Sequence, residues 1–100
     1  CDEVFGPVVS LWPIRDLEEG IARANAVDYG LHAAVFTRSL AAAMKAVEEL
    51  EAGGVMVNDS TDYRMDAMPF GGIKSSGLGR EGIRFALQEM TEPKTVCFNL

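Results

Sequence analysis

Histidine and cysteine, which supply most metal ligands and many nucleophiles, are nearly absent from this chain of 100 residues. The two cysteines, Cys1 and Cys97, lie almost the whole chain apart and lack the short spacing of a metal site. The single histidine, His32, lies in an apolar run with no cysteine or carboxylate patterned around it. We therefore expect no metal, two reduced thiols in an intracellular protein, and a structural role for His32.

Clusters of basic residues and long apolar runs are also missing. The formal net charge is −6, which argues against a surface for nucleic acid. No stretch approaches the roughly 18 apolar residues of a membrane span, and the first residues do not resemble a signal sequence. We expect a cytoplasmic protein that binds neither nucleic acid nor membrane. Because the chain starts at Cys1 and not at methionine, we also expect it to be a piece of a longer protein.

The sequence does contain clear patterns of alternating helices and strands. Asp16, with Glu19 three residues later, and Ser39 predict two helix starts, and Gly53 predicts the end of the second helix. A third helix is predicted from Ile83. Strands are predicted over residues 7–14, 31–37, 55–58 and 94–100. The face of the second helix that we expect to be buried consists of its apolar residues at helical spacing: Leu40, Ala43, Met44, Val47 and Leu50.

This alternation predicts an α/β fold, with a mostly parallel twisted sheet and flanking helices. Ligands of such sheets bind beyond the carboxyl ends of the strands. The long aperiodic stretch after Asn58, residues 59–79, leaves such an end. Because so long a loop is usually functional, it is the first place where a binding wall is expected.

One glycine motif suggests a nucleotide site but lacks the required context. Gly77, Gly79 and Gly82 have the spacing G-x-G-x-x-G. A dinucleotide fingerprint also needs a preceding apolar strand and an acidic residue about 20 positions later, and the sequence has neither. We interpret these glycines as a tight backbone path into a helix.

Five stretches together resemble the NAD(P)-dependent aldehyde dehydrogenases: "DEVFGPVV", "ANAVDYGLHAAVFT", "AGGVMVND", "PFGGIKSSGLGREG" and "MTEPKTV". They follow one another in the family's order along the whole chain, and the series is far more specific than any of its parts. The resemblance implies that residues 1–93 are the C-terminal part of the catalytic domain. It also implies that residues 94–100 are a closing strand for oligomerisation, in a homodimer or homotetramer.

The resemblance implies NAD or NADP as cofactor, bound through Glu3 and Phe5. In the family the acid at the position of Glu3 accepts hydrogen bonds from the nicotinamide ribose, which suits a carboxylate because it can accept from two hydroxyls at once. The aromatic side chain at Phe5 packs beside the cofactor. The segment that distinguishes NAD from NADP matches no part of this chain.

The family's catalytic cysteine and glutamate match no position here, so we predict that the 100-residue chain alone is inactive. Cys1 aligns with the cofactor segment and not with the nucleophile. Cys97 lies in the predicted closing strand, as a packing or edge residue. Arg80, Glu81 and Glu92 are interpreted as structural, and in the family residues at Arg80 and Glu92 form salt bridges near the subunit interface.

The loop "DYRMDAMPF" resembles the wall of the family's substrate entrance, which makes Tyr63, Arg64 and Phe70 candidate substrate-binding residues. Similar loops occur in family members that oxidise short polar or anionic aldehydes, and a guanidinium group is the preferred partner of carboxylate and phosphate. In the alternative interpretation, Arg64 pairs with Asp62 or Asp66 and only stiffens the loop. For the whole chain, the alternative is a truncated, non-catalytic paralogue that acts as an interaction module.

Overall fold

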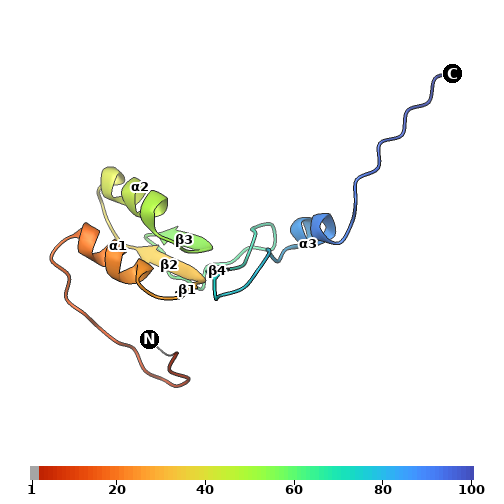
Figure 1. The fold of residues 1–100 in the computed structure, drawn as a ribbon. Coiled ribbons are helices and arrows are strands. Elements are labelled where there is room, and N and C mark those ends of the chain that lie inside the picture. The colour runs from red at the N-terminus through yellow and green to blue at the C-terminus, as the bar shows by residue number, and fades with distance from the viewer. Residues whose placement is uncertain (1–2) are drawn as a thin grey trace.

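The computed structural model describes residues 3–100 and shows an elongated molecule (Figure 1). Its principal extents are 69 × 34 × 22 Å and its radius of gyration is 18.0 Å, whereas a compact domain of this length has about 13 Å. Residues 15–57 form a packed unit, residues 58–100 an arm, and residues 3–14 a leading segment. Cys1, whose role as nucleophile the sequence argues against, lies outside the described residues.

The first helix of the packed unit, α1 (Leu17–Asn25), begins where its cap predicts. The Asp16 side chain accepts a hydrogen bond from the Glu19 N–H at 2.8 Å. The Glu19 carboxylate does not complete a capping box on Asp16. It accepts instead from Arg15, at 3.1 Å from the backbone N–H and 2.8 Å from Nε. The helix start is therefore fixed by contacts between neighbours in the sequence.

The second helix, α2 (Leu40–Glu49), also begins at its predicted cap, because the Ser39 hydroxyl accepts from the Ala42 N–H at 3.3 Å. It ends at Glu49, so the predicted end at Gly53 is wrong by four residues. Its buried positions are Ala43 and Ala46, which pack toward α1 and the sheet.

The apolar face predicted for α2 is therefore only partly correct. Three of its larger members are exposed: Leu40, Met44 and Val47. The small alanines let the helix approach α1 and the sheet closely, and this side is shifted by about one residue from the face with the larger apolar side chains.

Two small sheets are present, and only one is parallel. Strands β2 (His32–Val35) and β3 (Gly54–Val57) pair in parallel around the α2 crossover, with His32 opposite Gly54. Strands β1 (Tyr29–Gly30) and β4 (Ile73–Lys74) pair antiparallel. The described residues thus form one parallel and one antiparallel pair and not the mostly parallel sheet predicted. Strands β1 and β4 were not predicted from the sequence, because a two-residue strand is too short to show alternation of apolar and polar residues.

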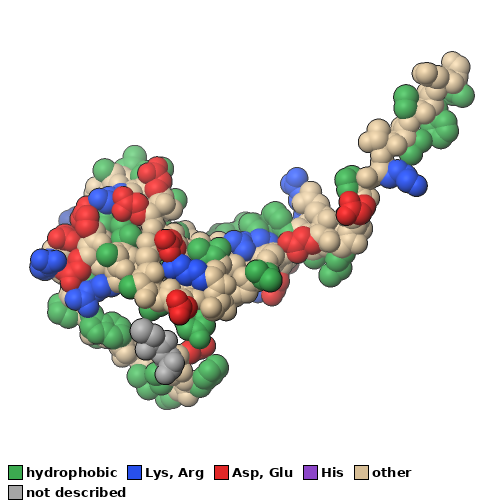
Figure 2. All heavy atoms as spheres, in the orientation of Figure 1, with side chains coloured by type: hydrophobic (Ala, Val, Ile, Leu, Met, Phe, Trp, Pro, Cys, Tyr) green, Lys and Arg blue, Asp and Glu red, His purple; other side chains and the backbone are tan. Residues whose placement is uncertain are grey.

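The buried apolar side chains all belong to the packed unit: Ile21, Ala43, Ala46 and Met56. Figure 2 shows hydrophobic side chains on the surface of every part of the molecule. In the leading segment Phe5 is 92% and Trp12 67% exposed, and residues 3–14 form no strand. The strand predicted at 7–14 is therefore not formed, since the described residues offer this segment no pairing partner.

The arm ends in α3 (Ile83–Glu89) and an extended tail, residues 91–100 (Figure 1). The predicted strand at 94–100 has no partner among residues 3–100, and Phe98 is 82% exposed. None of the described helices is long and apolar enough to cross a membrane.

Lys74, in β4 of the arm, binds to the packed unit through its side chain. Its Nζ donates to the carbonyl oxygens of Asn25 at 2.8 Å and Val27 at 3.2 Å, and it pairs with Glu51 at 2.5 Å. The first two oxygens lie at and just beyond the C-terminal end of α1, where a cation is favoured. The loop between β3 and β4 is therefore held at both ends, by β3 on one side and by Lys74 on the other.

Candidate functional site

The predicted substrate residues lie in the loop of residues 58–72, which follows the carboxyl end of β3. Arg64 and Phe70 are in contact: the Arg64 Cζ lies 4.2 Å from the centroid of the Phe70 ring, in a cation–π arrangement. The hydroxyl of Tyr63 donates to the Met65 sulfur at 3.3 Å. The structure thus joins two of the three predicted substrate residues directly and places the third beside Arg64 in the chain.

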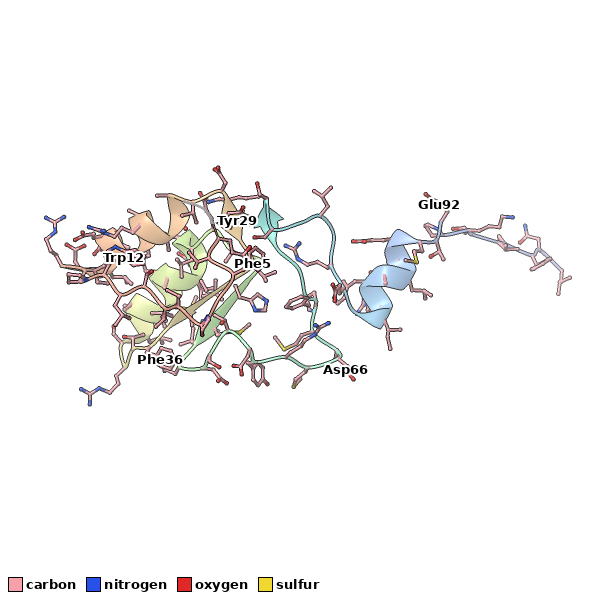
Figure 3. All side chains as sticks on the ribbon, turned by 90° about the horizontal axis from the view of Figure 1, so that it is seen from below. Phe5, Trp12, Tyr29, Phe36, Asp66 and Glu92 are labelled. Atoms are coloured by element: carbon pink, nitrogen blue, oxygen red, sulfur yellow. The ribbon has the colours of Figure 1, made fainter. Side chains whose placement is uncertain are left out.

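The ionic partner of Arg64 is Glu81, across the arm. The Arg64 Nη2 donates a hydrogen bond to the Glu81 Oε2 at 3.0 Å. The predicted alternative of a pair with Asp62 or Asp66 is therefore wrong. The Asp62 carboxylate accepts from the Ser60 hydroxyl, and Asp66 lies at the outer edge of the loop in Figure 3. The sequence did not reveal the pair with Glu81, because seventeen positions separate the two residues.

Phe70 is held from two sides. Its backbone pairs with that of Glu81, with N–H to carbonyl distances of 3.1 and 2.6 Å. Its ring meets His32 edge-on, with 5.0 Å between centroids. The His32 Nδ1–H donates to the Thr61 carbonyl at 2.9 Å. His32 thus supports the loop from the strand β2, and these contacts give it a packing role.

Glu3, the predicted ribose ligand, lines a hollow of about 680 Å³ beside the end of β1 and the start of β2. Gly30, His32 and Ser76 line the same hollow. Among residues 3–100 no donor bonds to the Glu3 carboxylate, which leaves both of its oxygens free to accept. This donor-free carboxylate beside a hollow fits a pair of sugar hydroxyls. His32 connects the two predicted subsites, because it lines this hollow and touches Phe70.

Phe5 does not share this arrangement. Its side chain is 92% exposed and lines no part of the hollow that Glu3 lines. Most of the Phe5 ring is therefore open to solvent in this chain.

The three glycines of the G-x-G-x-x-G spacing all adopt positive φ, at 127° for Gly77, 71° for Gly79 and 121° for Gly82. This confirms the tight backbone path, since such angles favour glycine. The Glu89 carboxylate lies against Gly79 and accepts from the Arg80 N–H at 3.2 Å. A carboxylate at this place disfavours a phosphate.

Arg80 bonds to backbone oxygens in this chain. Its Nη1 donates to the carbonyls of Gly72 at 3.0 Å and Gly79 at 2.7 Å, and it forms no ion pair within residues 3–100. It therefore ties the two glycine turns of the arm together. The subunit-interface salt bridges predicted for Arg80 and Glu92 stay a prediction, and Glu92 is exposed on the tail (Figure 3).

The carboxyl group whose pKa is lowered most, that of Glu19, lies in the packed unit and not at the candidate site. Hydrogen bonds from Arg15, and then from Arg23, lower the pKa of Glu19 to about 2. Lys45 likewise lowers the pKa of Glu18. No three potential metal ligands converge anywhere in residues 3–100.

Comparison with known proteins gives a consistent family. The family model described as "Aldehyde dehydrogenase family" matches residues 1–96. Aspartate-semialdehyde dehydrogenase 1 of Pseudomonas canavaninivorans is 57% identical over 99 residues, which are 99% of this chain and 21% of that protein. The 3-sulfolactaldehyde dehydrogenase of Priestia aryabhattai is 49% identical over 98% of this chain and 20% of its own length. The chain thus spans about a fifth of these relatives.

Solved structures agree with this assignment. Aldehyde dehydrogenase 21 from Physcomitrella patens, in complex with the reaction product succinate, superposes with a TM-score of 0.87 at 44% identity, over 91% of this chain and 19% of that one. An NADP-dependent glyceraldehyde-3-phosphate dehydrogenase from Bacillus halodurans, complexed with NADP, gives 0.83 at 41% identity over 88% and 18%. Betaine aldehyde dehydrogenase from Staphylococcus aureus, in complex with NAD+, gives 0.81 at 40% over 88% and 17%.

Proposed function

Since this chain belongs to the aldehyde dehydrogenase family, we propose that the protein carrying it oxidises an aldehyde to a carboxylate with NAD or NADP. The observation that carries the proposal is the family match over residues 1–96. We propose the cytoplasm as its location, on the sequence evidence for reduced thiols. The chemistry proceeds through a cysteine thiohemiacetal and a thioester, formed by residues of the protein beyond this chain.

In this proposal, residues of this chain bind the nicotinamide ribose. Glu3 supports the proposal because its carboxylate is free of donors within the described residues and borders a hollow. It holds two ribose hydroxyls and thereby orients the ring, which accepts a hydride when the cofactor is bound. Phe5 packs beside the cofactor. The exposure of its ring in the chain alone is consistent with a surface that another group covers.

Tyr63, Arg64 and Phe70 form part of the substrate wall, and the substrate carries a negative charge. Arg64 supports this proposal, because its Cζ lies over the Phe70 ring, 4.2 Å from the centroid, and further N–H donors are free among residues 3–100. Relatives named for aspartate semialdehyde and 3-sulfolactaldehyde, and a similar structure containing succinate, all involve anionic compounds. A carboxylate or sulfonate is the chemistry that a guanidinium group binds best.

The tail completes the proposal. Residues 94–100 form a strand against a neighbouring subunit, in a homodimer or homotetramer. The tail supports this because it is extended, has apolar residues at alternate positions, and pairs with no strand among residues 3–100.

The decisive experiment is Arg64→Ala in the complete protein. We expect KM for succinic semialdehyde to rise by about tenfold to a hundredfold, because one charge-assisted contact is worth about 1.5 to 3 kcal/mol. KM for butanal, which has the same chain length and no charge, should change by less than about twofold. Steady-state kinetics with both aldehydes measure this difference.

Arg38→Ala is the matched control, because Arg38 is exposed, forms no ion pair within residues 3–100, and lies outside the site. It removes the same charge and should leave both KM values unchanged. Equal rises for both aldehydes in Arg64→Ala would show that Arg64 only stiffens the loop.

A further inference from the structure

We infer that Glu81 is the positioning residue of the anion site, which holds the Arg64 guanidinium group in the orientation that receives the substrate's charged end. This inference rests on the proposed role of Arg64 in binding an anionic aldehyde. It adds a residue from the start of α3 to a site that otherwise consists of the loop after β3.

Two contacts restrain the Arg64 guanidinium group. The Arg64 Cζ lies over the Phe70 ring at 4.2 Å from its centroid, and the Glu81 carboxylate accepts a hydrogen bond from Nη2 at 3.0 Å. These restraints are themselves joined, because the backbones of Phe70 and Glu81 exchange two hydrogen bonds. The ring that supports the guanidinium group and the acid that orients it therefore move together.

The arrangement leaves the guanidinium group able to bind a second anion. A guanidinium group carries five N–H donors, and Glu81 uses one nitrogen. No other acceptor bonds to Arg64 within the described residues. Nη2 is thus held by Glu81, whereas the other guanidinium nitrogens remain free to donate directional hydrogen bonds to a carboxylate or sulfonate.

The exposure of the pair separates orientation from stability. The Arg64 and Glu81 side chains are 51% and 68% exposed. Ion pairs so open to water contribute little to folding. The contact therefore matters for where the guanidinium group points, since a free arginine side chain samples many rotamers.

The test compares Glu81→Ala and Glu81→Gln in the complete protein. We expect Glu81→Ala to raise KM for succinic semialdehyde about fivefold, corresponding to roughly 1 kcal/mol of lost orientation. KM for butanal and kcat for both aldehydes should stay unchanged. Glu81→Gln should restore most of the lost affinity, because its amide oxygen still accepts from Nη2.

Binding provides a second readout that does not depend on turnover. Titration calorimetry with succinate should show a weaker Kd in Glu81→Ala and a near-normal Kd in Glu81→Gln. Asp66→Asn is the matched control for charge, since Asp66 lies in the same loop without pairing with Arg64 (Figure 3). It should leave KM and Kd unchanged.

Four outcomes would overturn the inference or the anion site on which it rests. A tighter KM for succinic semialdehyde in both variants would mean that Glu81 competes with the substrate for Arg64. Equal rises for both aldehydes would assign Glu81 to the general architecture of the arm. Unchanged kinetics beside a selective effect of Arg64→Ala would remove Glu81 alone, whereas loss of selectivity in Arg64→Ala itself would remove the proposed anion site.

Discussion

The packed unit and the segments that flank it are built on different principles. Residues 15–57 contain the side-chain-capped helices, the parallel strand pair and all four buried apolar side chains. Among the described residues, the leading segment and the arm contain one two-residue strand, β4, the seven-residue helix α3, and long stretches without regular structure. Every predicted binding residue lies in these flanking segments, and none in the packed unit.

This contrast teaches how the chain divides its work. The packed unit is held rigid by local helix caps and by close packing of small residues. The flanking segments present polar groups on exposed backbone, where they remain available for a ligand or another part of the protein. Substitutions in the two kinds of region should therefore have different effects. Those in the packed unit should change the stability of the protein, and those in the leading segment and the arm should change its kinetics.

The largest effect on stability is expected where the packed unit and the arm meet. A Cβ atom on Gly53 would lie 1.7 Å from the Gly71 carbonyl oxygen, so the backbone of the arm must shift in Gly53→Ala. We expect the complete protein to lose about 3 kcal/mol of stability, as for a severe overpacking substitution. The thermal midpoint and the soluble yield measure this loss.

Gly6→Ala provides the control, because a Cβ atom there would meet no atom within 4 Å. Its thermal midpoint should match that of the parent. If Gly53→Ala were as stable as Gly6→Ala, the arm would not be docked against the start of β3, and the division into packed unit and arm would need to be redrawn.

A smaller effect, on rate instead of stability, is expected at Glu3. Glu3→Gln keeps the size of the side chain but loses its charge and one acceptor oxygen, so the cofactor ring should be oriented less well. We expect kcat to fall about tenfold, the factor that about 1.4 kcal/mol of transition-state positioning gives. The Kd of the cofactor should weaken less, because its adenosine half is held elsewhere.

The isotope effect sharpens this test. A deuterated aldehyde should give a larger primary isotope effect in Glu3→Gln than in the parent, since hydride transfer becomes more rate-limiting. Glu48→Gln is the control, because Glu48 is exposed on α2 and forms no ion pair within residues 3–100. Unchanged kcat and isotope effect in Glu3→Gln would make Glu3 an ordinary surface acid.

The smallest effect is expected from acid at the start of α1. Arg15 and Arg23 hold the pKa of Glu19 at about 2, below the ordinary value of 4.5. A carboxyl group with a lowered folded-state pKa stabilises the fold fully above its ordinary pKa, and this stabilisation is lost as pH falls toward the folded value. The contribution of Glu19 should therefore be constant from neutral pH to about 4.5 and decline below it.

Thermal midpoints of the parent and Glu19→Gln, measured from neutral pH to pH 3, test this directly. The parent should be more stable near neutral pH, and the difference should shrink in acid. Glu48→Gln, measured alongside, controls for the removal of a carboxylate that forms no ion pair among residues 3–100. A constant difference for Glu19→Gln would mean that its contacts with Arg15 and Arg23 do not depend on its charge.

The fold could be predicted where contacts lie close together in the sequence. Asp16 and Ser39 fixed the starts of α1 and α2, because a capping side chain bonds only three residues away. The crossover from β2 through α2 to β3 followed from the same local patterns. The strand predicted at 7–14 was wrong, because pairing requires a partner from elsewhere. The face of α2 was misplaced, because burial depends on which neighbour approaches.

For the candidate site, the sequence alone determined the family resemblance and the identities of Glu3, Tyr63, Arg64 and Phe70 as candidates. Only the tertiary structure decided their neighbours. It placed Arg64 against Glu81 instead of Asp62 or Asp66, brought Phe70 onto His32, and tied Lys74 to the end of α1. The physical reason is distance along the chain: capping and periodicity act within a few residues, whereas these contacts join residues 17 to 49 positions apart, which only the folded path of the backbone brings together.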